Sequence, residues 1–369
     1  MTALASDTAA LDAAPVLVHV TRGGFVESAH RATLVATDAA GGTPLRHGRV
    51  DDPVLPRSSL KPIQALAMVR LGLDLPPHLL ALVCSSHSGE AVHRDAVAEI
   101  MATAGLGLDA LRTTPSLPLG ELEHARWLAA GTTPAPVTQD CSGKHAGMIV
   151  TCRVNGWPVE SYLETDHPLQ VAIRETTAEV VGPVTHTTVD GCGAPLFAVP
   201  LSGLAAAFGR LAAADPTTDE GRVAEAMRTA PHMVGGTGRD VTTFMEAMPG
   251  LIAKDGAESV YAAGLPDGRG VAVKVADGAP VARAGRERRQ HLQPLRHDLA
   301  RGRDAVVGRR VPGRKLEHRK LRREEGERGA HRRHPPVVAG DVDHGRAAFG
   351  GRLRLLRQQG CVHALGGAG

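Results

Sequence analysis

The apolar positions near the N-terminus fall into short runs that glycine and charged residues separate. These runs, rich in valine and alanine, predict short strands at 16–20, 25–26 and 32–37. Much farther along, two alternating runs at 259–265 and 270–276 flank a segment with proline and glycine, and this pattern predicts a β-hairpin.

Helical periodicity dominates the middle of the chain. In 60–73 apolar residues recur every three or four positions, and Pro62 fits the first turn, where a missing N–H costs little. The short apolar run at 79–84 is interpreted as a buried strand. Amphipathic helices are further expected at 93–106, 167–182, 200–214 and 222–228. Because helices and strands are mixed and no internal repeat is visible, the fold class is expected to be α/β or mixed α+β.

The composition excludes several functional classes. The chain has 369 residues, of which 43% are hydrophobic, 22% charged and only 2% aromatic; it therefore lacks the aromatic faces of a base-stacking nucleic-acid platform. No apolar run approaches the roughly 20 residues that span a bilayer, and the N-terminus lacks the basic segment of a signal peptide. Five cysteines do not indicate a disulfide framework. We expect a cytoplasmic protein with no membrane partner.

Charge divides the chain near residue 280. Residues 1–280 hold 20 Lys+Arg and 30 Asp+Glu, a balance of −10, whereas residues 281–369 hold 22 and 9, a balance of +13. We predict a catalytic domain over 1–280 and a basic tail rich in Arg, Gly and His over 281–369. The tail has three interpretations: translation of a GC-rich gene in a shifted frame, which we favour, a disordered tail, or an arm that binds nucleic acid.

The segment RSSLK at 57–61 places a serine and a lysine three residues apart. At a helix N-terminus this spacing puts Ser58 and Lys61 on one face. A buried, neutral lysine can take the proton of a serine hydroxyl and activate it as a nucleophile, as in penicillin-binding proteins and class A β-lactamases. The alternative is structural, with the serine capping a helix and the lysine in solvent.

A polar cluster, CSSHSGE at 84–90, directly follows the buried run at 79–84. Polar residues at the end of a buried strand are typical of functional sites. The alternative is a helix N-terminal turn in which a serine and Glu90 form a capping box.

Two further segments, CSGKH at 141–145 and DGCGAP at 190–195, each place a cysteine beside glycine and a polar residue. Thiolate is a good zinc ligand, so the two cysteines could share a metal. Neither segment contains a C-x-x-C pair, and a buried, unreactive thiol is the alternative for each.

Lysine is scarce in residues 1–280, where only Lys61, Lys144, Lys254 and Lys274 occur. A buried lysine can lose its proton near neutral pH, whereas arginine cannot. Lys274 interrupts an apolar strand pattern and is a candidate base. Its alternative role is a strand residue whose amine reaches solvent.

Five motifs in this order resemble one family: RSSLKPIQAL, CSSHSGE, CSGKHAGM, VDGCGAP and KDGAESVYAAGLPDGRGVAVKVADG. The family is that of the Rhizobium etli type asparaginases, and the resemblance covers roughly residues 16–280. It implies hydrolysis of L-asparagine to L-aspartate and ammonia, a fold similar to glutaminases and serine β-lactamases, and a homodimer. The resemblance stops near Gly278, whereas the family continues with further folded sequence.

The resemblance also implies roles for individual residues. It matches the active serines and their lysine partners to Ser58, Lys61, Ser86 and Lys274. It matches three zinc ligands to Cys141, Lys144 and Cys192. It matches residues lining the substrate pocket to Arg57, His145 and Asp190. The expected mechanism is serine attack on the side-chain amide with an acyl-enzyme intermediate, and either serine could attack.

Three other functions stay open at this point. A serine amidohydrolase for glutamine or β-lactams would need the same serine and lysine residues. A nucleic-acid-binding protein would depend on the basic tail and would lose affinity steeply with salt. An inactive family member would fold without turnover.

Overall fold

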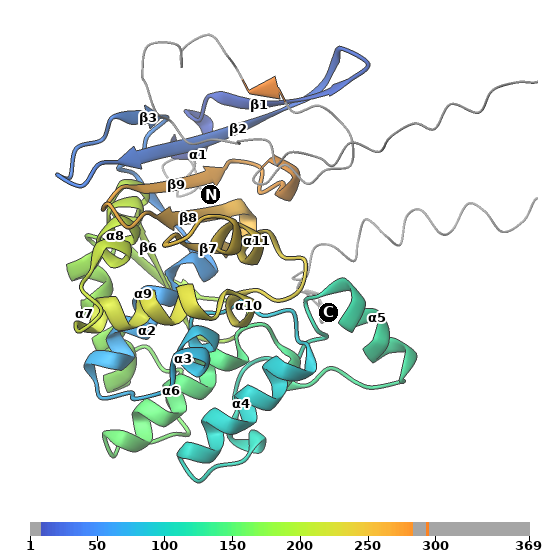
Figure 1. The fold of residues 1–369 in the computed structure, drawn as a ribbon, viewed down its shortest axis with the longest axis vertical. Coiled ribbons are helices and arrows are strands. Elements are labelled where there is room, and N and C mark those ends of the chain that lie inside the picture. The colour runs from blue at the N-terminus through green and yellow to red at the C-terminus, as the bar shows by residue number, and fades with distance from the viewer. Residues whose placement is uncertain (1–8, 283–292, 295–369) are drawn as a thin grey trace, which may run out of the picture. The chain divides into compact units, whose positions relative to one another are not determined.

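The computed structural model describes residues 9–282 and 293–294 (Figure 1). The predicted basic tail, 281–369, lies outside the described residues except for 281–282 and 293–294, so the interpretation of the tail stays a prediction. Most of the described strands come in two groups near the ends of the described region, and most of the helices come between these groups.

The described α-helices are α1 Ala9–Asp12, α2 Lys61–Arg70, α3 Pro77–Val83, α4 Ala91–Thr103, α5 Glu121–Ala129, α6 Ser142–Val154, α7 Pro168–Val180, α8 Leu201–Ala213, α9 Asp219–Thr229, α10 Pro231–Val234 and α11 Asp240–Ala247. The strands are β1 Val16–Arg22, β2 Phe25–Thr37, β3 Leu45–His47, β4 Pro53–Val54, β5 His186–Val189, β6 Pro195–Pro200, β7 Ile252–Gly256, β8 Val260–Gly264, β9 Gly270–Val275 and β10 Gln293–Pro294. A 3₁₀ turn, η1 Arg57–Leu60, leads into α2, and another, η4 Ala257–Ser259, joins β7 to β8.

The larger sheet is antiparallel and has the strand order β10-β1-β2-β9-β8-β7, with β3 paired to β2. The N-terminal hairpin β1–β2 therefore joins strands that come more than 200 residues later, which lie directly below it in Figure 1. A second sheet has the order β4-β6-β5. In both sheets every pairing within the described residues is antiparallel.

Helix α8 packs on the larger sheet against β2, β8 and β9. Two glycines allow this close approach. A Cβ atom added at Gly264 would lie 1.9 Å from the carbonyl oxygen of Phe208, and one at Gly270 would lie 1.9 Å from that of Ala205. The absence of a side chain on these strands thus lets the helix backbone rest on the sheet.

A layer of helices lies below the larger sheet in Figure 1, where α2, α3, α4, α6 and α9 lie together. Helix α3 packs against α6 and α9, and α2 packs against α7. Gly143 on α6 faces α3 closely, because an added Cβ atom would lie 2.4 Å from the carbonyl oxygen of Leu82. Eleven of the thirteen residues of α6 are buried, so this helix forms the centre of the layer.

The architecture confirms the expected mixed α+β class, with helices and antiparallel sheets in one chain. The predicted hairpin is also confirmed, since β8 and β9 pair with Val260 opposite Lys274. The interpretation of 79–84 as a strand is wrong: Pro77–Val83 forms the helix α3. An apolar run of six residues has no periodicity that separates a buried helix from a buried strand. The two strands expected at 25–26 and 32–37 are one strand, β2, and the strands β3 to β7 were not predicted.

Across the described ranges, the structure contains no helix that is both long and apolar enough to cross a membrane.

Candidate active site

The hydroxyl of Ser86 lies between two lysine amines. Lys61 Nζ donates a hydrogen bond to Ser86 Oγ over 3.1 Å, and Lys254 Nζ donates one over 2.9 Å. All three side chains are buried, with exposed fractions of 3% or less. A serine held by two amines in a dry site has a base at hand for its proton.

Three elements from distant parts of the sequence bring these groups together. Lys61 is the first residue of α2, and Lys254 lies in the middle of β7. Ser86 follows the C-terminal end of α3, in a segment outside the helices and strands that binds the C-terminal end of α10: the N–H of Ser86 donates to Val234 O, and that of Ser88 donates to Gly235 O. These backbone hydrogen bonds, and not a helix, position the serine.

Lys254 has the electrostatics of a general base. Burial lowers its pKa to about 8, with further lowering by the nearby Lys61 and Arg239, while Asp255 opposes the shift. Its amine donates to Ser86 Oγ, to Asp255 O and to Asp255 Oδ1. A fraction of Lys254 is therefore neutral close to physiological pH, which a proton acceptor requires.

Lys61 has the opposite character. Burial alone would lower its pKa, but the neighbouring Cys141 and Asp140 outweigh burial and hold the pKa above its ordinary value. Its amine also donates to Ser85 O, and Asp140 Oδ2 lies 3.6 Å away. Lys61 thus stays an ammonium ion beside Ser86 and stabilises negative charge there.

His87, although adjacent to Ser86, is arranged as a structural group. Its Nδ1 accepts a hydrogen bond from Gly89 N, and its Nε2 then carries the proton and donates to Ser142 Oγ over 2.8 Å. Burial lowers the pKa of His87 well below its ordinary value, so the ring is neutral. Because its one lone pair is occupied, it has none left for the serine proton.

The structure pairs the predicted serines and lysines differently from the sequence interpretation. Ser58 lies half-buried in η1, and no hydrogen bond of the described residues joins its hydroxyl to Lys61, whose amine instead reaches Ser86. Lys274 lies on β9, where its amine donates to Glu258 O and Val275 O. The lysine of the hairpin region that contacts Ser86 is Lys254, twenty residues earlier.

Two predicted pocket residues form an ion pair. Arg57 Nε and Nη2 each lie 2.8 Å from Asp190 Oδ1, which also accepts a hydrogen bond from Gly191 N. Arg57 has a φ of +51°, a left-handed conformation that costs a non-glycine residue free energy. The ion pair holds this strained backbone at the start of η1, where the chain enters α2.

Cys141, Lys144 and Cys192, the predicted metal ligands, are gathered by the fold. Lys144 Nζ lies 3.3 Å from Cys192 Sγ, and all three side chains are buried. A hydrogen bond from the Cys141 thiol, with the positive charge of Lys144, lowers the pKa of Cys192 to about 5, and the same bond raises the pKa of Cys141. The pair thus favours the thiolate form at Cys192.

The donor set fits a metal that prefers sulfur and nitrogen. Two sulfurs and an amine would give three ligands, and zinc accepts such ligands. Among the described residues no group of three or more His, Cys, Asp or Glu could hold a metal ion, so any metal here would depend on the lysine. The pKa of Lys144 is raised by the sulfur groups despite its burial, and metal binding would therefore have to release its proton.

His145, the third predicted pocket residue, has one buried nitrogen with no hydrogen-bond partner in the described structure, Nε2. Its Nδ1 lies 2.7 Å from the hydroxyl of Tyr162, which also accepts a hydrogen bond from Arg112 N. Burial lowers the pKa of His145 to about 3, so the ring is neutral. An unpartnered ring nitrogen beside Lys144 could contact a polar group of a ligand.

Glu90 is the N-cap residue of α4, but its side chain makes no capping hydrogen bond, so the capping-box alternative is wrong. Its carboxylate accepts hydrogen bonds from Ser88 Oγ over 2.7 Å, from Thr237 N over 2.7 Å and from Thr237 Oγ1 over 2.9 Å. These bonds outweigh burial and lower the pKa of Glu90 to about 2. Glu90 therefore ties the Ser86 segment to the loop after α10.

The sequence interpretation missed four residues of the site: Asp140, Arg239, Lys254 and Asp255. Lys254 had a signal, because it is one of the four lysines of residues 1–280 and interrupts the apolar run LIAKDG. Arg239 and Asp140 lie in loops, and nothing in their local sequence indicates a partner.

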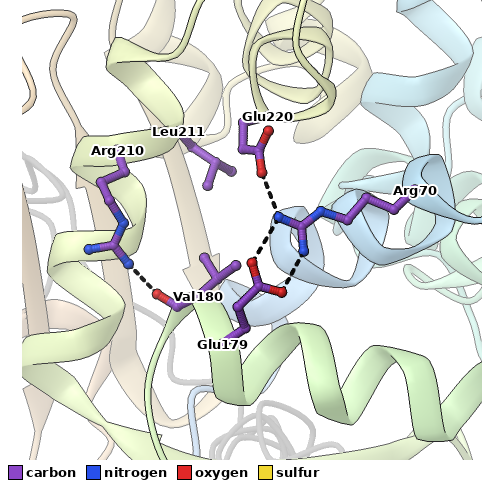
Figure 2. Close-up of a pocket in the computed structure, with 6 residues that line it drawn as sticks. All are labelled: Arg70, Glu179, Val180, Arg210, Leu211 and Glu220. Carbon is purple, nitrogen blue, oxygen red and sulfur yellow. Dashed lines mark hydrogen bonds and ion pairs between the residues drawn. The ribbon is translucent and has the colours of Figure 1, made fainter.

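A surface pocket of about 490 Å³ lies elsewhere on the molecule (Figure 2). Arg70 crosses it to form ion pairs with Glu179 and Glu220, and Arg210 binds the carbonyl oxygen of Val180. Arg70 ends the helix that Lys61 begins, which separates their backbones by about 14 Å. The polar groups of this pocket thus bind one another.

Residues 18–286 match the sequence model of the L-asparaginase II family. The match spans most of the chain and makes the protein an amidohydrolase by class. The chain belongs to the L-asparaginase II family.

No curated protein sequence matches the chain. Among solved structures, "Crystal Structure Analysis of Mglu" is 15% identical with a TM-score of 0.30, and the alignment covers 77% of this chain and 71% of that one. "Crystal Structure Analysis of Mglu in its glutamate form" is 16% identical with a TM-score of 0.32, over 76% of this chain and 65% of that one. The family assignment is based on the sequence match, not on these distant likenesses.

Proposed function

We propose that the chain is an L-asparaginase of the Rhizobium etli type, which hydrolyses the side-chain amide of L-asparagine to L-aspartate and ammonia. Membership of the L-asparaginase II family supports the reaction class. The observation that carries the mechanism is the Ser86 hydroxyl, which lies within 3.1 Å of both Lys61 and Lys254.

In the proposed mechanism Ser86 is the nucleophile and Lys254 is the base. Neutral Lys254 accepts the serine proton as Ser86 Oγ forms a bond to the amide carbon of the substrate. The C–N bond then breaks, and the ammonium form of Lys254 returns the proton to the leaving nitrogen, so that ammonia departs. Water attacks the resulting ester with Lys254 again as base, which releases aspartate and restores the serine.

Lys61 has an electrostatic role in this proposal. It stays charged through the cycle and stabilises the serine oxygen as that atom becomes negative. Arg57, His145 and Asp190 are proposed substrate-binding residues. His145 supports this role with its unpartnered Nε2, and Arg57 and Asp190 do so with their ion pair at the start of η1.

We further propose that Cys141, Lys144 and Cys192 hold a zinc ion. When bound, zinc supplies a Lewis acid that can polarise or orient a carbonyl group. The buried cluster of two sulfurs and one amine supports this assignment. A homodimer in the cytoplasm, with a small-molecule substrate and without nucleic acid, completes the proposal.

The test measures ammonia release by the purified full chain with L-asparagine and, separately, with L-glutamine, and it follows ring opening of a β-lactam by the loss of its ultraviolet absorbance. We expect turnover of L-asparagine, its loss in Ser86→Ala, and its retention in Ser28→Ala, a matched control on the exposed part of β2. If the protein turned over only L-glutamine or only the β-lactam, that compound would replace L-asparagine as the proposed substrate. Loss of turnover in Ser58→Ala but not in Ser86→Ala would make Ser58 the nucleophile. A folded protein with no turnover would overturn the proposal.

A further inference from the structure

We infer that Arg239 is a positioning residue that keeps Lys254 available as a base, by sharing the negative charge of the Asp255 carboxylate that also contacts the lysine amine. The inference rests on the proposed function in one respect, that Lys254 takes the proton of Ser86. Arg239 itself is not in contact with the serine through any hydrogen bond of the described structure.

The geometry is a chain of four groups. Arg239 Nη2 donates to Asp255 Oδ2 over 2.6 Å, and Lys254 Nζ donates to the other oxygen, Asp255 Oδ1, also over 2.6 Å. Lys254 Nζ then reaches Ser86 Oγ over 2.9 Å. The Asp255 side chain is 7% exposed and that of Arg239 15%, so water screens these charges little.

The contact between Asp255 and Lys254 works against a catalytic base, and a second cation beside Asp255 is needed to offset it. A buried carboxylate at 2.6 Å from an amine strongly favours the ammonium form of that amine. Lys254 would then stay protonated and could not act as a base. Arg239 cannot give up its proton, so its guanidinium shares the carboxylate charge without itself titrating, and the hold of Asp255 on the Lys254 proton is weakened.

Other charged and titratable groups face Lys254 from the elements around it. Lys61 at the start of α2 also disfavours the ammonium form, and Asp140, ahead of α6, favours it. Cys84, at the end of α3, is a neutral thiol because burial raises its pKa to about 12. Among these described groups, Arg239 is the cation that acts on Lys254 through a shared contact with the Asp255 carboxylate.

The backbone around Arg239 is held against the serine segment. Glu90 binds both Ser88 and Thr237, two residues before Arg239. Gly236 has a φ of +111°, and an added Cβ atom there would lie 1.6 Å from Ser88 Oγ. The loop therefore packs directly on the segment that carries Ser86, and the position of Arg239 is coupled to that of the nucleophile.

The direct test measures the protonation of Lys254 without any turnover. Protein labelled with ¹³C-lysine is titrated by NMR, and the Lys254 signal is assigned by its absence in Lys254→Arg; the sequence contains six lysines, which keeps the spectrum simple. In Arg239→Gln we expect the midpoint of Lys254 to rise by about one pH unit, a tenfold gain in proton affinity. In Arg239→Lys, which keeps a cation, the Lys254 midpoint should stay close to that of the unaltered protein. An unmoved midpoint in Arg239→Gln overturns the inference.

Asp255→Asn provides an independent arm with the opposite sign. Loss of the carboxylate removes the group that holds the proton, so the Lys254 midpoint should fall. This variant also decides the matter if Arg239→Gln does not fold, as judged by circular dichroism, since a midpoint that does not fall in Asp255→Asn overturns the inference.

Kinetics then separates this inference from the proposed function. In Arg239→Gln the acidic limb of kcat/KM should move to higher pH by the same amount, with most activity regained at alkaline pH. An equal loss at every pH, with an unmoved midpoint, shows a structural role and overturns the inference. If the Lys254 midpoint shifts in Arg239→Gln but the unaltered protein hydrolyses no amide, the inference is upheld and the proposed function is contradicted.

Discussion

The amine of Lys254 lies 2.9 Å from the hydroxyl of Ser86, although 168 residues separate them in the chain. Lys274, which the sequence interpretation paired with this serine, lies two strands away and donates to backbone carbonyls. The two lysines occupy the same antiparallel sheet, so they form a natural pair of variants for testing which one performs chemistry.

Lys254→Met is expected to lower kcat by about 10²–10⁴-fold, the usual contribution of a general base. Lys274→Met is the matched control and should keep kcat within a few-fold, because its amine binds only Glu258 O and Val275 O among the hydrogen bonds of the described structure. The measurement is steady-state ammonia release from L-asparagine. The reverse order of effects would return Lys274 to the catalytic role.

The pH dependence of kcat/KM should follow the protonation of Lys254. Its pKa of about 8 is lowered from the ordinary lysine value, and the base is active only when neutral. The rate should therefore rise with pH through a midpoint near 8 and fall tenfold per unit well below it. A profile flat between pH 6 and 9 would exclude Lys254 as the base.

Cys192→Ala is expected to abolish stoichiometric zinc binding, measured by metal analysis after dialysis against a trace of zinc. Two ligands remain in this variant, fewer than a protein zinc site normally has. Cys152→Ala is the matched control, since Cys152 is buried on α6 away from the Lys144 cluster. Zinc binding to the unaltered chain should also release protons, because the ammonium of Lys144 must lose one to become a ligand. Equal zinc content in both variants would contradict the proposed ligand set.

Glu90→Gln is expected to destabilise the fold near neutral pH by about 1–3 kcal/mol, since it weakens charge-assisted hydrogen bonds to Ser88 and Thr237. The pKa of Glu90 is about 2 in the folded chain, below the ordinary 4.5. The stabilisation is thus fully present above pH 4.5 and is lost as pH falls through 2. Urea unfolding of both proteins at pH 7 and at the lowest pH where they fold should show the difference shrink with acid. A constant difference would assign the effect to packing.

Much of the site could be predicted from sequence because its residues lie in compact motifs. Ser86, Cys141, Lys144 and Cys192 each stand beside glycine or serine at the end of an element, and the fold brings all four into the buried region that the motifs indicated. Their chemical roles stay predictions that the experiments above test.

The pairing of serines with lysines could not be predicted in this way. Spacing within RSSLK indicates that Ser58 and Lys61 share a face only if both belong to one α-helix. The structure places Ser58 in a 3₁₀ turn and starts α2 at Lys61, so the lysine amine is free to reach Ser86. A change of helix type over three residues has no clear signal in composition.

The sequence by itself determined the mixed α+β class, the hairpin of β8 and β9, and the motifs that carry the buried polar residues, because each depends on local periodicity or on a few adjacent residues. Only the tertiary structure decided that Lys254 and not Lys274 meets Ser86, and that Arg239 and Asp255 stand behind it. Those contacts depend on the order of strands in the sheet and on a loop packed against the serine segment. Both are set by long-range packing, which no local pattern encodes.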